Sequence, residues 1–213
     1  MPGEVAAKHD SVGRLSRGGD LVVNDKTGER VITLVGTGDG MGDRLAADLR
    51  VRPGGALVAE HYHPGLVERF RVISGTLEAS LDGERKTLET GADVEIPPGM
   101  VHDWWNAGDE EARVLVEVTP GRRFEIMVTT LFGLANDGKS NDKGLPSMPQ
   151  LALIAREFSD IVRFVKPPVP VQRALFGPLA LVGKARGMKG YYPRYLEPAG
   201  HEEPDAELLA MIT

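Results

Sequence analysis

The chain has 213 residues, of which 41% are hydrophobic and 26% charged, and its formal net charge is −6. This length and composition are typical of a globular protein with one domain or one domain and an appendage, and the negative charge argues against a general nucleic-acid binder. The chain has no cysteine, which excludes disulfides, zinc–thiolate sites, iron–sulfur clusters and a cysteine nucleophile. A metal site would therefore have to use histidine and carboxylate ligands.

The N-terminal residues contain no apolar core of the kind that a signal peptide needs, and no stretch approaches the roughly 18 apolar residues of a membrane span. We therefore expect a cytoplasmic protein without a membrane span. Residues 1–19 are rich in glycine, serine and charged side chains. They are predicted to form a flexible N-terminal segment.

Residues 20–132 are predicted to form an antiparallel β-barrel, because short apolar segments alternate there with turn sequences. The pair Asp82 and Gly83, for example, is a strong hairpin signal between two such segments. The predicted strands are 21–23, 30–35, 45–51, 57–63, 67–73, 76–81, 84–88, 93–96, 113–118 and 124–131.

The pattern changes after residue 132. Residues 133–149 are predicted to be a linker, and residues 150–213 a C-terminal helical extension. Apolar side chains recur at helical spacing over 151–165 and again over 171–182. The segment 151–195 holds eight Lys or Arg residues and two acidic residues. We interpret it as a dimer arm or a lid over the barrel mouth, with an effector or membrane-docking surface as the alternatives.

Three of the five histidines lie in a pattern that suits a metal ion. His61 and His63 are two residues apart on a predicted strand, so both side chains point to the same face. A Pro-Gly turn follows, and Glu68 can return on the neighbouring strand, while His102 opens another short strand. Three imidazoles and one carboxylate on adjacent strands could converge on one divalent ion.

These residues belong to two longer motifs. The first is G-x5-H-x-H-x4-E-x6-G, formed by Gly55, His61, His63, Glu68 and Gly75. The second is G-x5-P-x-G-x2-H-x3-N, formed by Gly91, Pro97, Gly99, His102 and Asn106. With every spacing kept, the chain resembles the cupin superfamily, and it looks like the single-domain bacterial members that are similar to quercetin dioxygenase.

The resemblance implies a mainly β fold, an antiparallel jelly-roll barrel followed here by C-terminal α-helices. It also implies that His61, His63, Glu68 and His102 bind one metal ion. Nitrogen and oxygen ligands of this kind suit Fe, Mn, Ni, Co or Zn. Many cupins are homodimers, so the resemblance implies a homodimer as well.

Alternation along the strands indicates which side chains share the metal's face. Leu57 and Ala59 have the parity of His61, Phe70 and Val72 have that of Glu68, and Trp104 has that of His102. None of these five is cationic or an amide. They predict a pocket for an apolar or aromatic small molecule, with ordinary barrel core as the alternative interpretation.

The first functional hypothesis is a metal-dependent dioxygenase that acts on a small enol or phenol-type substrate, with Glu68 also serving as the catalytic base. The second is a metal-dependent isomerase, decarboxylase or lyase that acts on a small carbonyl compound. The third is a non-catalytic module that binds or senses a small molecule. Because a fold hosts many chemistries, the motifs leave all three open.

Overall fold

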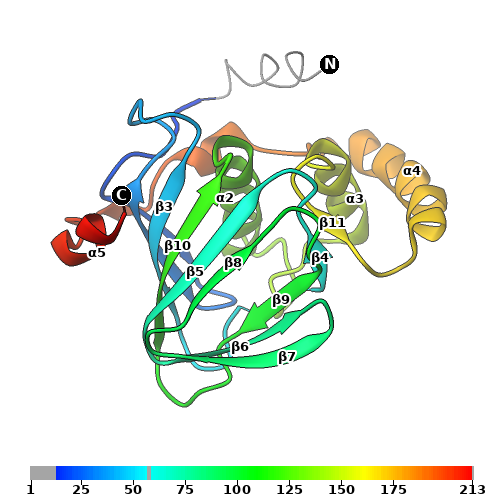
Figure 1. Cartoon of the computed structure of the whole chain (residues 1–213). Helices are drawn as coiled ribbons and strands as arrows, with labels where there is room; N and C mark the ends of the chain where they lie inside the picture. The colour runs from blue at the N-terminus through cyan, green and yellow to red at the C-terminus, as the bar shows by residue number, and fades with distance from the viewer. Residues whose placement is uncertain (1–12, 57–58, 213) are drawn as a thin grey trace.

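The computed structural model describes residues 13–56 and 59–212, and two antiparallel sheets account for the body of the molecule (Figure 1). The larger sheet has the order β12-β1-β2-β3-β10-β5-β8, and the smaller has the order β11-β4-β9-β6-β7. The strands of the larger sheet are β1 (Asp20–Asn24), β2 (Glu29–Val35), β3 (Leu45–Val51), β5 (Val67–Ser74), β8 (Asp93–Ile96), β10 (Ala112–Thr119) and β12 (Gly200–His201). Those of the smaller sheet are β4 (His61–Tyr62), β6 (Thr76–Leu81), β7 (Glu84–Glu89), β9 (His102–Trp105) and β11 (Arg163–Phe164).

The two sheets pack face to face, and the main hydrophobic core lies between them. Along β5 the side chains alternate between buried and partly exposed, as expected of a strand with one face on the core. Val72 on β5 and Leu77 on β6 belong to this core and are almost fully buried. Each such side chain contributes roughly 1.5–3 kcal/mol to stability through the hydrophobic effect. The architecture is the predicted antiparallel jelly-roll with C-terminal helices.

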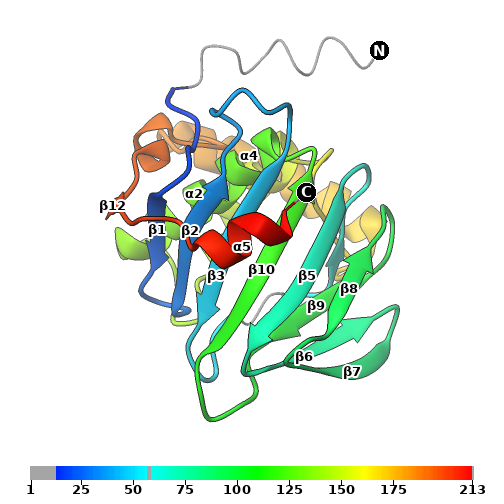
Figure 2. The same ribbon diagram turned by 60° about the vertical axis from the view of Figure 1, so that its left-hand side comes forward.

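Two helices cover opposite faces of the larger sheet. Helix α2 (Arg122–Asn136) lies on its concave, inner face, whereas α5 (Ala206–Met211) crosses its outer face (Figure 2). On the inner side, Ile126 packs into the main core, and on the outer side Leu208 packs against Leu34 and Leu115. The inner face of β1, β2 and β3 is therefore closed by a helix, where the smaller sheet does not reach.

The predicted strand 124–131 is wrong, because these residues lie within α2. The sequence Phe-Glu-Ile-Met-Val-Thr-Thr-Leu satisfies strand alternation and is rich in β-branched residues, which explains the prediction. Its buried positions, however, include Ile126, Met127, Thr130 and Leu134, which recur at helical spacing. Helix α2 also extends through residue 136, into the segment that was predicted to be a linker.

The C-terminal part contains helices but also contributes strands. Helix α3 (Met148–Glu157) ends eight residues short of the predicted end at Val165, and the chain then forms β11, which pairs with β4. Helix α4 (Val169–Ala185) contains the second predicted helical stripe and continues through Pro178. Farther on lie η2 (Pro193–Leu196) and β12, which extends the larger sheet beside β1. The C-terminal segment is therefore built into both sheets.

The predicted flexible segment 1–19 is described only from residue 13. Within that part, Arg14 forms a two-point ion pair with Asp20, and Ser16 donates two hydrogen bonds to the buried carboxylate of Glu125 on α2. Arg14 and Ser16 thus make specific contacts with the rest of the fold. In the described part of the chain, no helix has the length and apolar character needed to cross a membrane.

Most predicted strands are confirmed to within a residue or two at each end. The exception besides 124–131 is the predicted strand 57–63: residues 57 and 58 lie outside the described residues, and β4 comprises only His61 and Tyr62. This short strand pairs with β9 on one side and β11 on the other.

Candidate metal centre and cavity

Four predicted ligands come from both sheets. His61 lies on β4, His63 directly follows it, and His102 is the first residue of β9, opposite His61 in the register. Glu68 lies on β5 of the larger sheet. All four side chains are buried. The fold therefore brings together the residues that the two motifs singled out.

The three histidines are arranged as a metal site requires. One donor atom from each of His61, His63 and His102 lies within 4.8 Å of the others. The ring centroids are 4.3 Å apart for His61 and His102, and 4.9 Å apart for His61 and His63. Three imidazoles at this spacing could hold a metal ion.

Each imidazole is oriented by a backbone carbonyl. In all three rings Nδ1 donates a hydrogen bond to a carbonyl oxygen, and because a carbonyl only accepts, Nδ1 must carry a proton. The bonds are His61 to Ala59 (2.9 Å), His63 to Ile161 (2.7 Å) and His102 to Met100 (3.0 Å). In the neutral tautomer that this fixes, Nε2 keeps its lone pair for a metal, which is the outer-shell arrangement common around metal-bound histidines.

The Glu68 carboxylate sits between two of these Nε2 atoms. Its Oε2 lies 3.2 Å from Nε2 of His102 and 3.2 Å from Nε2 of His63. Burial raises the pKa of Glu68, but the hydrogen bond from His102 and the close His63 ring outweigh burial and lower it well below its usual range. Burial likewise lowers the pKa of His102, yet the hydrogen bond to Glu68 and its charge raise it overall. Each of the two groups therefore stabilises the charged form of the other.

The pKa of His61 is shifted in the opposite direction. Burial, together with the nearby rings of His102 and His63, lowers the pKa of His61 to about 4, so its ring is neutral near pH 7. Nε2 of His63 is buried and makes no hydrogen bond within the described structure, although it faces the Glu68 oxygen. A buried nitrogen without a hydrogen bond and a neighbouring carboxylate are together suited to bind a cation. The donor set of three nitrogens and one oxygen fits a first-row divalent ion.

The site opens on a cavity of about 260 Å³ between the inner face of the larger sheet, the smaller sheet and helices α2 and α3. His61, His63 and Glu68 line one end of it. The inward-facing rows of β2 and β3 and the inner side of α2 line the rest, and most of these side chains are apolar. Representative members are Val31, Leu45, Leu49, Val128, Leu131 and Phe132.

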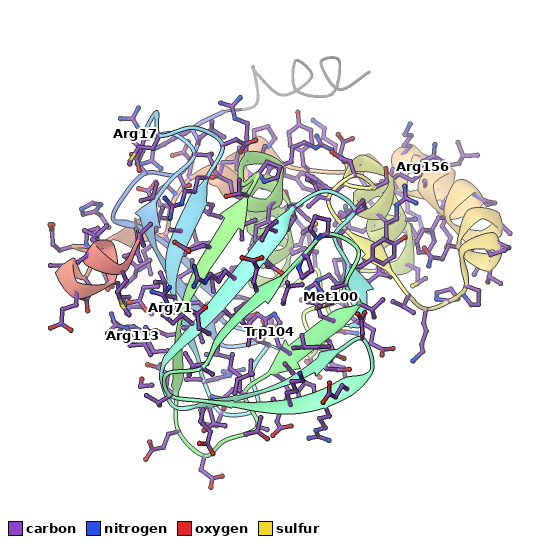
Figure 3. All side chains as sticks on the ribbon, viewed as in Figure 1. Arg17, Arg71, Met100, Trp104, Arg113 and Arg156 are labelled. Atoms are coloured by element: carbon purple, nitrogen blue, oxygen red, sulfur yellow. The ribbon has the colours of Figure 1, made fainter. Side chains whose placement is uncertain are left out.

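Three of the predicted pocket residues line this cavity: Ala59, Phe70 and Trp104. The rings of Phe70, from the larger sheet, and Trp104, from the smaller, meet with centroids 5.5 Å apart, and Figure 3 shows Trp104 between the sheets. Val72 is buried in the core and is not among the lining residues. Leu57 lies outside the described residues.

The motifs did not point to several residues that shape the site. The Phe124 ring on α2 meets the His63 ring edge-on, with centroids 5.9 Å apart, but the prediction of a strand there hid it. The carbonyl of Ile161 orients His63 from 98 positions along the chain, and a backbone carbonyl has no sequence signature. Glu29 also lines the cavity. The alternation of β2 could have indicated this, because Glu29, Val31 and Thr33 share one face.

Residues 47–118 match the cupin domain family. The chain contains a cupin domain. This confirms the predicted membership of the cupin superfamily, and the matched segment holds all four predicted ligands. Among solved structures, an RmlC-like cupin from Shewanella frigidimarina is 18% identical with a TM-score of 0.42, covering 49% of this chain and 87% of that chain.

Two curated relatives are proteins of Streptomyces. The chain is 38% identical over 104 residues to "Polyketide synthase CurC" of Streptomyces cyaneus, covering 49% of this chain and 61% of that protein. It is 33% identical over 66 residues to "Tetracenomycin polyketide synthase protein TcmJ" of Streptomyces glaucescens, covering 31% of this chain and 44% of that protein. The cupin domain thus spans about half the length of the curated relatives it matches.

Proposed function

We propose that this cupin is a metal-dependent enzyme that isomerises or cyclises an enolisable, polyketide-like substrate. The observation that carries the proposal is the cluster of three buried histidines, with Glu68 beside two of its rings, at one end of an apolar cavity. The names of two relatives, which describe polyketide synthase proteins, support this substrate class. A metal bound there would supply Lewis-acid polarisation of a substrate oxygen.

The lining of the cavity favours this substrate over a sugar phosphate. A phosphate needs Arg, Lys or a helix N-terminus close by. Among the described lining residues the only cationic side chain is Lys143, which is exposed and belongs to the loop after α2. Phe70 and Trp104 instead offer aromatic surfaces beside the histidine end. A ring system or an extended keto chain fits these contacts.

Glu68 is the proposed base. A carboxylate whose pKa is held low is a weak base, so it suits a proton that is already acidic, such as that of an enol or of a carbon between two carbonyl groups. In this scheme Glu68 takes that proton and returns it later, so the reaction consumes no oxidant. His61, His63 and His102 hold the metal, and the apolar walls exclude water from the enolate.

The test is an activity assay with a metal inventory. The protein is purified, its bound metal is measured by elemental analysis, and a panel of β-diketones and polyphenols is followed by mass spectrometry with and without O₂. We expect metal-dependent conversion without a change in oxidation state, lost in Glu68→Gln and kept in the surface control Glu84→Gln. Conversion by the metal-free protein, or full activity of Glu68→Gln, would refute the proposal.

The second candidate is dioxygenation of the same enol or phenol-type substrate. The aromatic pair Phe70 and Trp104 beside the histidine end favours dioxygenation, because two aromatic rings suit a planar phenol. The resemblance of the motifs to quercetin dioxygenase-like proteins predicts the same reaction. The same assay separates the two candidates: O₂ uptake in step with substrate loss indicates the dioxygenase, and turnover under nitrogen indicates the isomerase or cyclase. Tight binding of the panel without turnover would indicate a non-catalytic binding module.

We further propose a homodimer, as the motif resemblance predicted, and a cytoplasmic location. Light scattering coupled to gel filtration measures the mass directly. A mass of one chain would refute the dimer.

A further inference from the structure

We propose that the end of the cavity opposite the histidines is a second substrate subsite, in which Glu29 and Asn24 bind a hydroxyl group of the substrate. The inference deepens the proposed function, on which it rests, by assigning the residues that select the substrate. Both residues line the same cavity as the histidines, and both are at least nine-tenths buried.

The strand register places this subsite far from the metal centre. Glu29 pairs with Val51, the last residue of β3. Glu68 pairs with Val118 on β10, and Val118 pairs in turn with Leu45, the first residue of β3. The seven residues of β3 therefore separate the two levels, a span on the order of 20 Å at about 3.3 Å per residue. A ligand that touches both ends must be elongated.

Glu29 has unused hydrogen-bonding capacity. Its Oε2 accepts a hydrogen bond from the Thr27 hydroxyl, and the backbone N–H of Glu29 also bonds to the carboxylate, but no other side chain of the described residues donates to it. Arg52 is near enough for its charge to favour the ionised carboxyl, yet no described Lys or Arg forms an ion pair with Glu29. A buried carboxyl without such a partner is costly to keep. In keeping with this, burial raises the pKa of Glu29.

Asn24 supplies the complementary group. Its Oδ1 accepts hydrogen bonds from the backbone N–H groups of Lys26 and Thr27, which fixes the side chain. Because Oδ1 is engaged in this way, Nδ2 is the group that the buried Asn24 side chain can offer to a ligand in the cavity. Asn24 and Glu29 are cross-strand partners in the β1–β2 hairpin. An amide donor and a carboxyl acceptor therefore sit together at this end.

The loop after α2 covers this end of the cavity. Gly144 packs so tightly on Thr27 that a Cβ there would come within 2.8 Å of the Thr27 side chain, and Lys143, Gly144 and Leu145 line the cavity. The C-terminus of α2 is fastened to the same hairpin, because Asn136 bonds to Val23 and Asp25. The loop thus forms one wall of this end of the cavity.

One neutral group satisfies both residues. A phenolic or enolic hydroxyl can accept from the Asn24 amide and donate to the Glu29 carboxyl, and it adds no charge to a buried site. A ligand with an apolar end would leave both groups unsatisfied. The site should therefore bind a ligand that has a hydroxyl at this end more tightly than one that lacks it. We therefore infer a substrate with an oxygen function at each end.

The experiment compares two ligands by titration calorimetry on the purified protein. The probes are bisdemethoxycurcumin, an extended enolisable diketone with a phenol at either end, and its analogue with only one phenolic hydroxyl. We expect the wild type to prefer the diphenol by about fivefold, which corresponds to one neutral hydrogen bond. Glu29→Leu should reduce the preference to about one, Glu29→Gln should retain it, and the surface control Glu84→Gln should match the wild type.

A ligand change tests the same contact without any variant. The monomethyl ether of bisdemethoxycurcumin should bind to the wild type no better than the monohydroxy analogue, since one end can no longer donate. The inference is overturned if neither phenolic probe binds, if the ether binds as tightly as the diphenol, or if a folded Glu29→Leu keeps the preference. Binding affinity is read separately from turnover, so an inactive protein that still shows the preference would refute only the proposed reaction.

Discussion

The two ends of the cavity are both buried and both polar, yet they are built differently. At the histidine end, every Nδ1 is bonded to a backbone carbonyl, and Nε2 of His63 and of His102 lies beside Glu68. At the far end, Glu29 accepts from the Thr27 hydroxyl, and Asn24 accepts from two backbone N–H groups through Oδ1 alone. The first end is organised around a cation, and the second suits a neutral group that brings its own donor and acceptor. Four predictions probe this difference.

The largest effect is expected from removing two imidazoles. The double variant His61→Ala with His63→Ala should lose its bound metal entirely, because one histidine and one carboxylate remain of the proposed set. Elemental analysis after dialysis measures this. His201→Ala, which changes an exposed histidine on β12, should keep the metal. Full occupancy in the double variant would show that the ion does not bind at the histidine end.

Glu68→Gln tests the carboxylate alone. We expect the affinity for the metal to fall at least about tenfold, or about 1.4 kcal/mol, because a neutral amide replaces the one charged donor. Competition with a chelator of known affinity gives the number. Glu95→Gln, an exposed change on β8, is the matched control. An unchanged affinity in Glu68→Gln would mean that the three histidines suffice.

A smaller effect is expected from Asp160→Ala. Arg123 makes a two-point ion pair with Asp160 and also donates to the carbonyl of Glu157, which fixes the segment before Ile161. Because Asp160 is partly exposed, the loss of stability should be about 0.5–1 kcal/mol. The metal affinity should also fall slightly, since the Ile161 carbonyl orients His63.

The control for this change is Asp93→Ala, which removes an ion pair with Arg69 on the outer side of the barrel. It should lower the midpoint of thermal unfolding but leave the metal affinity unchanged. If the two variants weaken metal binding equally, the segment around Ile161 has no particular role in orienting the histidines.

The smallest effect is a pH dependence at the far end. Burial raises the pKa of Glu29 above its unfolded value of 4.5, so the folded state binds this proton more tightly. The stability that the protonated carboxyl contributes is complete below the unfolded pKa and is lost as the pH rises through the folded pKa.

Glutamine does not ionise, so Glu29→Gln should become progressively more stable than the wild type as the pH rises from about 4 to about 8. Urea unfolding at several pH values measures the difference, with Glu84→Gln as the control. If the stability difference between the two proteins stays constant, or shrinks as the pH rises, burial does not raise the pKa of Glu29. The proposal of a second subsite would then lose one of its supports.

The sequence predicted the histidine end better than any other part. Motif spacing named His61, His63, Glu68 and His102, and strand parity placed Phe70 and Trp104 beside them, because both signals are local. It failed at α2, where strand and helix periods fit the same residues and only packing against the sheet decides between them. The far end depends on the register of the β1–β2 hairpin and on a loop from residue 140 onward, which no local pattern encodes.

The hydrogen bond from His63 to Ile161 also bears on the order in which the protein is completed. The histidines, Glu68 and the strands that carry them are synthesised first, but the carbonyl that fixes the His63 ring, and the strand that flanks β4, follow tens of residues later. A nascent chain that ends after the barrel would hold two imidazoles in the right tautomer and leave the third free to turn.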